Sequence, residues 1–148
     1  TLTYIGEYSF INTGLRSIVI PDNVTYIGRA AMERCYDLTE CVLSENLKTI
    51  PVGALQFTSL STFTIPAKVE VIAAQLPGSL AEIYSLATIP PSLLDKGIIP
   101  DNDCPIYVPS SAIDAYRNAP IWSECADRIQ PIPGGGAGGD SGGPDNWE

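Results

Sequence analysis

An internal repeat constrains this chain more than any other feature. The stretch 15–28, LRSIVIPDNVTYIG, returns in altered form further along, for example as LSTFTIPAKVEVIA at 60–73. The isoleucines Ile5, Ile27, Ile50 and Ile72 mark the repeat at nearly equal steps along the chain. A period of about 22 residues predicts a solenoid, in which successive copies stack as coils around a shared core.

A second series of apolar positions keeps the same register. Leucines open each copy and a further large apolar residue or cysteine follows three positions later: Leu15, Leu38, Leu60 and Leu80, then Ile18, Cys41, Phe63 and Ile83. In L-x-x-I-x-I the last two apolar residues lie two apart, which is typical of a strand with one buried face. Pro21 and Pro66 follow directly and end the strand, because proline cannot donate to the ladder. We therefore expect one short strand per repeat.

The return half of each copy predicts a different local structure. Small or apolar residues at Ala31, Met32 and Cys35 have the spacing of one or two helical turns. Gly6 and Gly28 suit a bend ahead of that segment.

Residues 15–38, LRSIVIPDNVTYIGRAAMERCYDL, resemble the leucine-rich repeat of the BspA-like bacterial surface proteins, L-x-x-I-x-I-P-x-x-V-x-x-I-G-x-x-A-F-x-x-C-x-x-L. The departure is Met32, where the family has phenylalanine. The resemblance implies a leucine-rich repeat solenoid of mainly short parallel β-strands with short helical or turn return segments. We assign 1–86 to about four coils, the first truncated, and expect the chain to be the C-terminal piece of a longer protein.

After residue 86 the period breaks. Residues 87–133 resemble the segment that often closes BspA-like arrays, so we expect a small α+β cap there. Residues 106–108 predict a short strand ended by Pro109, and Ser111 with Asp114 predicts the start of a helix over AIDAYRNA that ends at Pro120. The residues expected to cover the apolar end of the coils are Tyr116, Ile121, Trp122 and Ile129. A sugar platform at Trp122 is the less favoured alternative.

The last segment, 134–148, reads GGGAGGDSGGPDNWE and has almost nothing to bury, so we expect it to be disordered. It contains GDSGGP, the string around the nucleophile of chymotrypsin-like serine proteases. That serine needs a histidine as its base, and the chain has no histidine. We interpret Ser141 as a coincidence of composition and expect no catalytic residue.

Cysteine and acidic residues give weak signals for metal. Cys35, Cys41, Cys104 and Cys125 show no C-x-x-C spacing, so a zinc site without histidine would need all four thiolates. We expect Cys35 and Cys41 to be buried free thiols, and a Cys104–Cys125 disulfide stays open. The acidic loop 101–103 lacks the glycine and glutamate of an EF-hand, so a solvated loop is expected. We expect no metal and no cofactor.

Charge and hydropathy limit the partners. The formal net charge is −9 with a pI near 4.3, which argues against nucleic acid. No apolar run approaches the roughly 20 residues that cross a bilayer, so no membrane span is expected in this chain. We expect a monomer.

The candidate site is the exposed face of the strands, between the buried positions. Two columns of residues form it: Ser17, Glu40, Thr62 and Glu82, then Val19, Val42, Thr64 and Tyr84. The resemblance implies that such a surface binds partners, here an extracellular or host protein, in a secreted or surface-attached setting. The leading hypothesis is a non-enzymatic adhesion or host-interaction module. The alternatives are a structural spacer and an accessory, sugar-directed domain of a larger enzyme.

Overall fold

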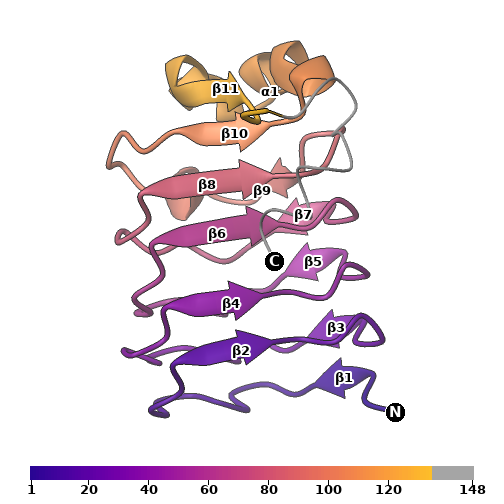
Figure 1. The fold of residues 1–148 in the computed structure, drawn as a ribbon, viewed down its shortest axis with the longest axis vertical. Helices are drawn as coiled ribbons and strands as arrows, with labels where there is room; N and C mark the ends of the chain where they lie inside the picture. Colours follow the sequence, from indigo (N-terminus) through magenta and orange to yellow (C-terminus); the bar gives the residue numbers. More distant parts are fainter. Residues whose placement is uncertain (135–148) are drawn as a thin grey trace.

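The computed structural model describes residues 1–134 and shows coils stacked along one axis (Figure 1). Each coil places one strand in a front column and a shorter one in a back column, and the paired strands are parallel. The front strands are β2 (Ser17–Val19), β4 (Glu40–Val42), β6 (Thr62–Ile65), β8 (Glu82–Ser85), β10 (Ile106–Val108) and β11 (Ile129–Pro131). The back strands are β1 (Tyr4–Ile5), β3 (Tyr26–Ile27), β5 (Thr49–Ile50), β7 (Val71–Ile72) and β9 (Ser92–Leu93). The architecture is the predicted solenoid.

Strand register follows the sequence repeat. Ile18 lies opposite Cys41 in β2 and β4, and Phe63 lies opposite Ile83 in β6 and β8. Phe63 and Ile83 are buried, as alternation along a strand with one inner face requires. Burial of such side chains from every coil, at about 1.5 to 3 kcal/mol each, provides the shared core.

The back strands were not predicted, since the sequence indicated one strand per repeat. Each is very short, with the second side chain buried: Ile5, Ile27, Ile50, Ile72 and Leu93. Such short strands cannot show an alternating pattern. The isoleucine series that revealed the period therefore marks the inner position of a second strand column.

The return segment after β3 is a chain of turns, so the predicted helical turns over residues 31–35 are wrong. Ala30 and Arg34 have positive φ angles of 55° and 61°, which interrupt a right-handed helix. Amide groups also point along the solenoid axis: Met32 N donates to Ala54 O at 3.1 Å and Arg34 N to Gln56 O at 2.9 Å. The amides between them stay within the segment, since Glu33 N donates to Ala30 O and Cys35 N to Met32 O, so the segment forms successive turns in place of a helix.

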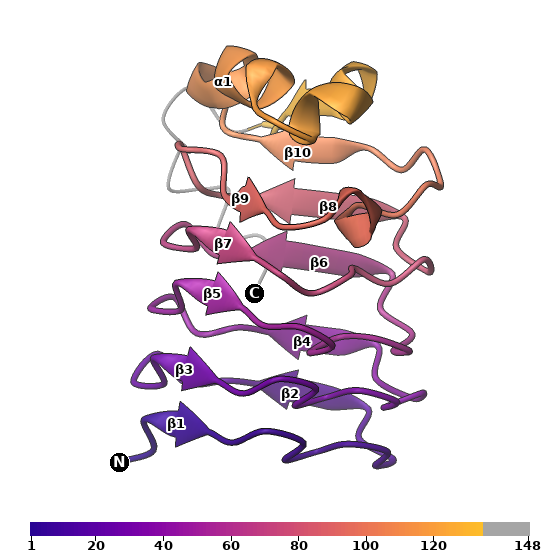
Figure 2. The same cartoon turned by 180° about the vertical axis from the view of Figure 1, so that it is seen from behind.

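Parallel pairing continues beyond residue 86, where the sequence period breaks. Strand β9 pairs with β7, and β10 pairs with β8, with Ile106 opposite Ile83 (Figure 2). The loop before β10 joins the coils through Asn102, whose side-chain amide donates to Gly78 O at 3.1 Å and Leu80 O at 2.7 Å. The division between repeats and cap at residue 86 stays a prediction from sequence, whereas the strand columns run on to β11.

The C-terminal end is closed by a short helix and by turns of 3₁₀ type. The elements after β9, besides the strands, are η1 (Lys96–Ile98), η2 (Ser110–Ala112), α1 (Ile113–Asn118) and η3 (Trp122–Arg128). The helix begins at Ile113 after η2, and no side chain caps it, so the predicted start at Ser111 is wrong. A 3₁₀ turn leads into the helix in place of the capping residue.

The cap residues expected to cover the coils do so. Tyr116, Trp122 and Ile129 are fully buried and Ile121 is half-buried. The rings of Tyr116 and Trp122 meet edge to face with centroids 5.0 Å apart, and Trp122 Nε1 donates to Pro91 O at 2.8 Å. A fully buried Trp122 cannot be a sugar platform, so that alternative is wrong.

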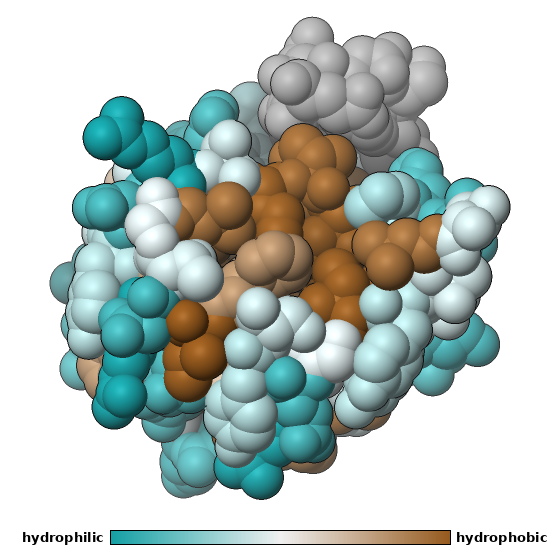
Figure 3. Space-filling model, turned by 90° about the horizontal axis from the view of Figure 1, so that it is seen from below, coloured by the Kyte–Doolittle hydropathy of each residue, from teal (hydrophilic) through white to brown (hydrophobic). Residues whose placement is uncertain are grey.

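The opposite end of the solenoid presents apolar side chains. Figure 3 shows them gathered at the centre of this end. Leu2 is exposed, and Phe10, Leu15 and Ile18 of the first coil are only partly buried. The predictions for Ser141 and for the tail beyond Gly134 lie outside the described residues.

Candidate protein-binding face

The eight candidate residues come together on one surface, which we call the front face: Ser17, Val19, Glu40, Val42, Thr62, Thr64, Glu82 and Tyr84. Strand pairing aligns them in the two predicted columns, with Ser17 opposite Glu40 and Val19 opposite Val42. Strands β6 and β8 form a second paired set, with Thr62 opposite Glu82 and Thr64 opposite Tyr84, and β4 and β6 belong to separate sheets.

Exposure on the front face is greatest near β2 and β4. Val19 is 70% exposed and Val42 is 44% exposed, and the two are direct neighbours across the strand pair. Thr64, Glu82 and Tyr84, nearer the cap, are partly buried. The front face therefore has an exposed pair of valines at one end and partly buried polar and aromatic side chains at the other.

An aromatic pair extends the front face toward the cap. Tyr107 of β10 lies opposite Tyr84, and their rings stack with centroids 5.0 Å apart and an interplanar angle of 27°. The Tyr84 hydroxyl donates to Glu82 Oε1 at 3.3 Å. Burial raises the pKa of Tyr84, and the Glu82 carboxylate and Tyr107 raise it further. The phenol therefore stays protonated well above neutral pH.

Sequence reasoning missed Tyr107 because it placed β10 outside the repeats. The signal was nevertheless present, since the step from Ile83 to Ile106 equals the step from Ile18 to Cys41. Tyr107 then falls in the same column as Tyr84, one coil further along, and Gln130 of β11 lies opposite it.

The charge of the front face is negative. Glu40 and Glu82 supply two carboxylates, and the eight residues include no lysine or arginine. Arg16, which directly precedes β2, is an exposed cation at the border. The sign agrees with that of the whole chain, at −9.

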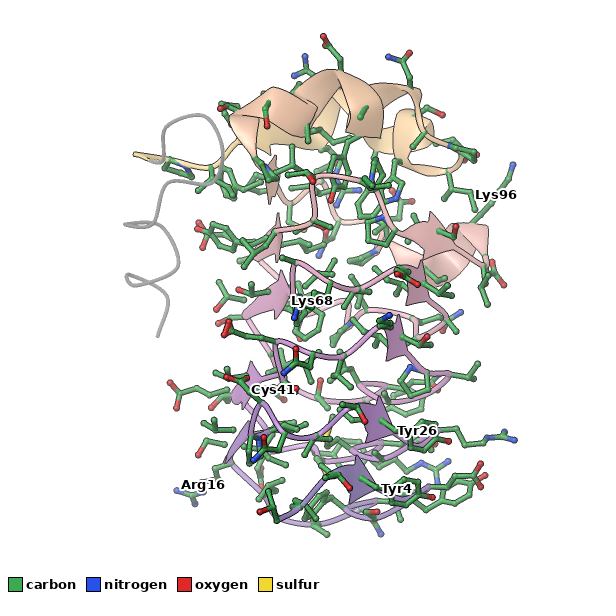
Figure 4. The ribbon with its side chains drawn as sticks, turned by 90° about the vertical axis from the view of Figure 1, so that its right-hand side faces the viewer. Tyr4, Arg16, Tyr26, Cys41, Lys68 and Lys96 are labelled. Carbon is green, nitrogen blue, oxygen red and sulfur yellow. The ribbon has the colours of Figure 1, made fainter. Side chains whose placement is uncertain are left out.

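A second aromatic group lies on the back strands. Tyr4 and Tyr26 are exposed and stack with centroids 4.9 Å apart and an interplanar angle of 12° (Figure 4). The guanidinium of Arg29 lies 6.0 Å from the centroid of the Tyr8 ring. Sequence reasoning did not single out these tyrosines, because the short back strands were not foreseen.

The four cysteines are free, so the open alternative of a Cys104–Cys125 disulfide is wrong. Partners lie close to these thiols: Arg128 Nη2 is 3.4 Å from Cys104 Sγ, and Cys125 Sγ donates to Trp122 O at 3.3 Å. Cys35 is buried as predicted, and its Sγ donates to Phe10 O at 3.0 Å.

Cys41 is partly exposed as a residue, so its predicted burial holds only in part. Burial of the thiol nevertheless raises its pKa to about 12, with Cys35 adding to the effect. The side chain occupies the inner side of β4, opposite Ile18, so the sulfur is more enclosed than the residue as a whole. The thiol therefore stays protonated and unreactive at neutral pH.

Within residues 1–134, no group of three or more histidine, cysteine or acidic residues could hold a metal ion. In the same part of the chain, no helix has the length and apolar character needed to cross a membrane.

Comparison with known proteins identifies the repeats. The family described as "BspA type Leucine rich repeat region (6 copies)" matches residues 1–79, which is more than half of the chain. The chain belongs to the BspA-type leucine-rich repeat family. The resemblance seen in residues 15–38 is thereby confirmed, together with the predicted fold class.

A solved structure supports the same assignment. The BspA-type chain is similar to the crystal structure of a leucine-rich repeat protein from Bacteroides capillosus ATCC 29799, with 33% identity and a TM-score of 0.50. The match covers 57% of this chain and 63% of that protein, so the chain spans less than two-thirds of its relative's length. No curated protein matches the chain.

Proposed function

We propose that this BspA-type module binds another protein through the front face. The observation that carries the proposal is the exposed pair Val19 and Val42, adjacent in a regular parallel ladder with their side chains directed outward. Complete burial of one valine side chain contributes about 1.5 kcal/mol or more, so a partner that buries Val19 and Val42 gains binding free energy. We place the module outside the cell or on its surface, in adhesion or host interaction, in line with its family.

The regular ladder determines how a partner meets this face. Paired strands lie about 4.8 Å apart, so β2 with β4, and β6 with β8, each present adjacent rows of outward side chains. Contact is then shared among several coils, and no single residue holds most of the binding energy. The module acts without catalysis in this proposal.

The test compares two pairs of lysine substitutions. Proteins captured from extracellular fractions by the wild-type module are purified, and their affinity is measured for Val19→Lys/Val42→Lys and for a control, Val52→Lys/Leu94→Lys. Val52 and Leu94 are also exposed, at 56% and 65%, but belong to the return segments. Affinity should fall more than tenfold, or about 1.4 kcal/mol, in the front-face variant only.

Equal losses in both variants, or no loss in either, contradict binding through the front face. Unchanged affinity in both would favour the structural spacer, for which the outward side chains carry no role. The sugar-directed accessory role has lost the residue that suggested it, because Trp122 is fully buried.

A further inference from the structure

We infer that the solenoid has a joint between its second and third coils, where two blocks of the molecule move relative to each other. The first block contains β1 to β4, and the second contains β5 to β11. The front face spans both blocks, so motion at the joint changes the angle between its exposed valines and its polar and aromatic side chains. The inference stands apart from the proposed function, because it depends only on how the coils are held together.

Both strand columns are interrupted at the same level. In the back column β1 pairs with β3, and β5 pairs with β7, which pairs with β9, but β3 and β5 belong to separate sheets. In the front column β2 pairs with β4, and β6, β8, β10 and β11 form one sheet, but β4 and β6 are not paired (Figure 1). All other successive strands within each column of residues 1–134 are paired. Since two columns on different sides of the molecule stop together, the interruption belongs to this level and not to one weak strand.

Pro51 accounts for the interruption in the back column. At the other levels the amide directly after the second strand of each pair donates to the last residue of the first strand: Gly28 N to Ile5 O at 2.8 Å, Ala73 N to Ile50 O at 2.8 Å and Leu94 N to Ile72 O at 3.2 Å. Pro51 occupies the same position after β5, and proline has no N–H to donate. The Ile27 carbonyl therefore cannot receive this hydrogen bond from the next coil.

The core is also loosely packed at this level. A narrow apolar cavity, too small to hold a water molecule, is lined by Ile27 and Met32 of one coil and by Ile50, Pro51 and Ala54 of the next. Met32 stands where the family repeat has the bulkier phenylalanine. Side chains that line a void lose van der Waals contacts on that side, so packing between the two coils is weakened where the ladders are interrupted.

The return loops hold the two blocks together across the joint. Three amides of the loop after β3 donate to carbonyls of the loop after β5: Ala30 N to Val52 O at 2.9 Å, Met32 N to Ala54 O at 3.1 Å and Arg34 N to Gln56 O at 2.9 Å. In the turns that follow the front strands, Lys68 Nζ donates to Asn46 Oδ1 at 2.8 Å, in an exposed hydrogen bond that water can replace. The return loops therefore act as the hinge, and the strand columns are the sides that open.

Amide hydrogen exchange in the wild-type chain, followed residue by residue by NMR, tests the joint. Two sets of loop amides are compared, each bonded to the next coil: an outer set, Tyr8, Phe10 and Asn12, and an inner set, Ala30, Met32 and Arg34. A uniform solenoid frays from its end, so its outer set would exchange faster than its inner set. With the joint, the inner set should exchange at least as fast as the outer set after correction for intrinsic rates.

Pro51→Ala supplies the missing donor. Ala73 and Leu94 show that a residue with both a Cβ and an N–H fits this position. Exchange of the inner set should slow at least fivefold in this variant. Pro21→Ala is the control, because it also replaces a proline by alanine, with the same effect on the entropy of the unfolded chain, but in an exposed turn of the first block. It should change the exchange of the inner set less than twofold.

Slower exchange of the inner set than of the outer set in the wild type overturns the joint. Pro51→Ala overturns it as well if exchange does not slow, or slows only as much as in Pro21→Ala. The wild-type comparison decides alone if Pro51→Ala does not fold. Binding through the front face is tested separately by Val19→Lys/Val42→Lys, so either inference can fail without the other.

Discussion

The hydroxyl of Tyr116 joins the cap to the last coils, and removing it tests how the solenoid end is held. The Tyr116 hydroxyl is hydrogen-bonded to Ser85 Oγ at 2.7 Å and donates a hydrogen bond to Ala87 O at 2.6 Å. Tyr116 and Ser85 are fully buried, so water cannot replace the lost partner. Tyr116→Phe breaks both bonds and leaves two buried polar groups unpaired, for which we expect a loss of about 2 to 3 kcal/mol in the free energy of unfolding.

A double-mutant cycle separates the two bonds. Ser85→Ala keeps the bond from Tyr116 to Ala87, so it should cost about 1 kcal/mol. The double variant should lose less than the sum of the single losses, because both remove the Ser85–Tyr116 bond. The measurement is urea unfolding followed by circular dichroism, with Tyr36→Phe as the exposed control. A Tyr116→Phe protein within about 0.5 kcal/mol of wild type, the effect of an ordinary surface substitution, would refute the reasoning.

Three further predictions concern glycine, disulfide formation and alkaline pH. A Cβ at Gly28 would lie 2.4 Å from Glu7 N, so Gly28→Ala should lower the free energy of unfolding by about 3 kcal/mol, while Gly14→Ala, with open space around it, should change it little in the same urea assay. Reductant should leave the intact mass unchanged, since Cys104 and Cys125 are free; a gain of the mass of two hydrogen atoms, which the reduction of a disulfide adds, would contradict this. Burial raises the pKa of Cys41 from about 9 to about 12, so the stability that the neutral thiol contributes below pH 9 is lost as pH rises toward 12. In Cys41→Ala the melting temperature should therefore fall less steeply between pH 9 and pH 12 than in the wild type. An unchanged slope of melting temperature against pH would argue against thiol burial.

The front strands could be predicted from the sequence because the same alternation of inward and outward side chains recurs in their repeats. Ile18, Cys41, Phe63 and Ile83 are chemically different, yet each holds the same inner position, and the pattern persists even where cysteine replaces a larger residue. From that register the outward columns followed directly, as strand alternation requires.

The failures share one cause, which is that contacts between coils decided the structure where local patterns were short. Residues 31–35 have helical spacing, but hydrogen bonds to the next coil hold them as turns. The step from Phe63 to Ile83 is shorter than the step from Ile83 to Ile106, and this irregularity hid the strand that carries Tyr107. Ser111 is a residue type that often caps the start of a helix, yet it lies inside the 3₁₀ turn η2.

The left-handed residues of the return loops show how a coil depends on its neighbour. Tyr8, Ala30 and Gly53 occupy one position in successive loops with φ of 60°, 55° and 74°, and Asn12, Arg34 and Phe57 occupy another with φ of 57°, 61° and 62°. Such angles cost non-glycine residues roughly 1 kcal/mol or more each. In the first two loops the amides donate to carbonyls of the next coil, for example Phe10 N to Ala31 O at 2.8 Å and Met32 N to Ala54 O at 3.1 Å, and these bonds offset part of the cost.

Either of these two coils would lose those bonds if it were isolated, so each of the two loops takes its conformation against the coil that follows it. Assembly should spread outward from coils that have already formed.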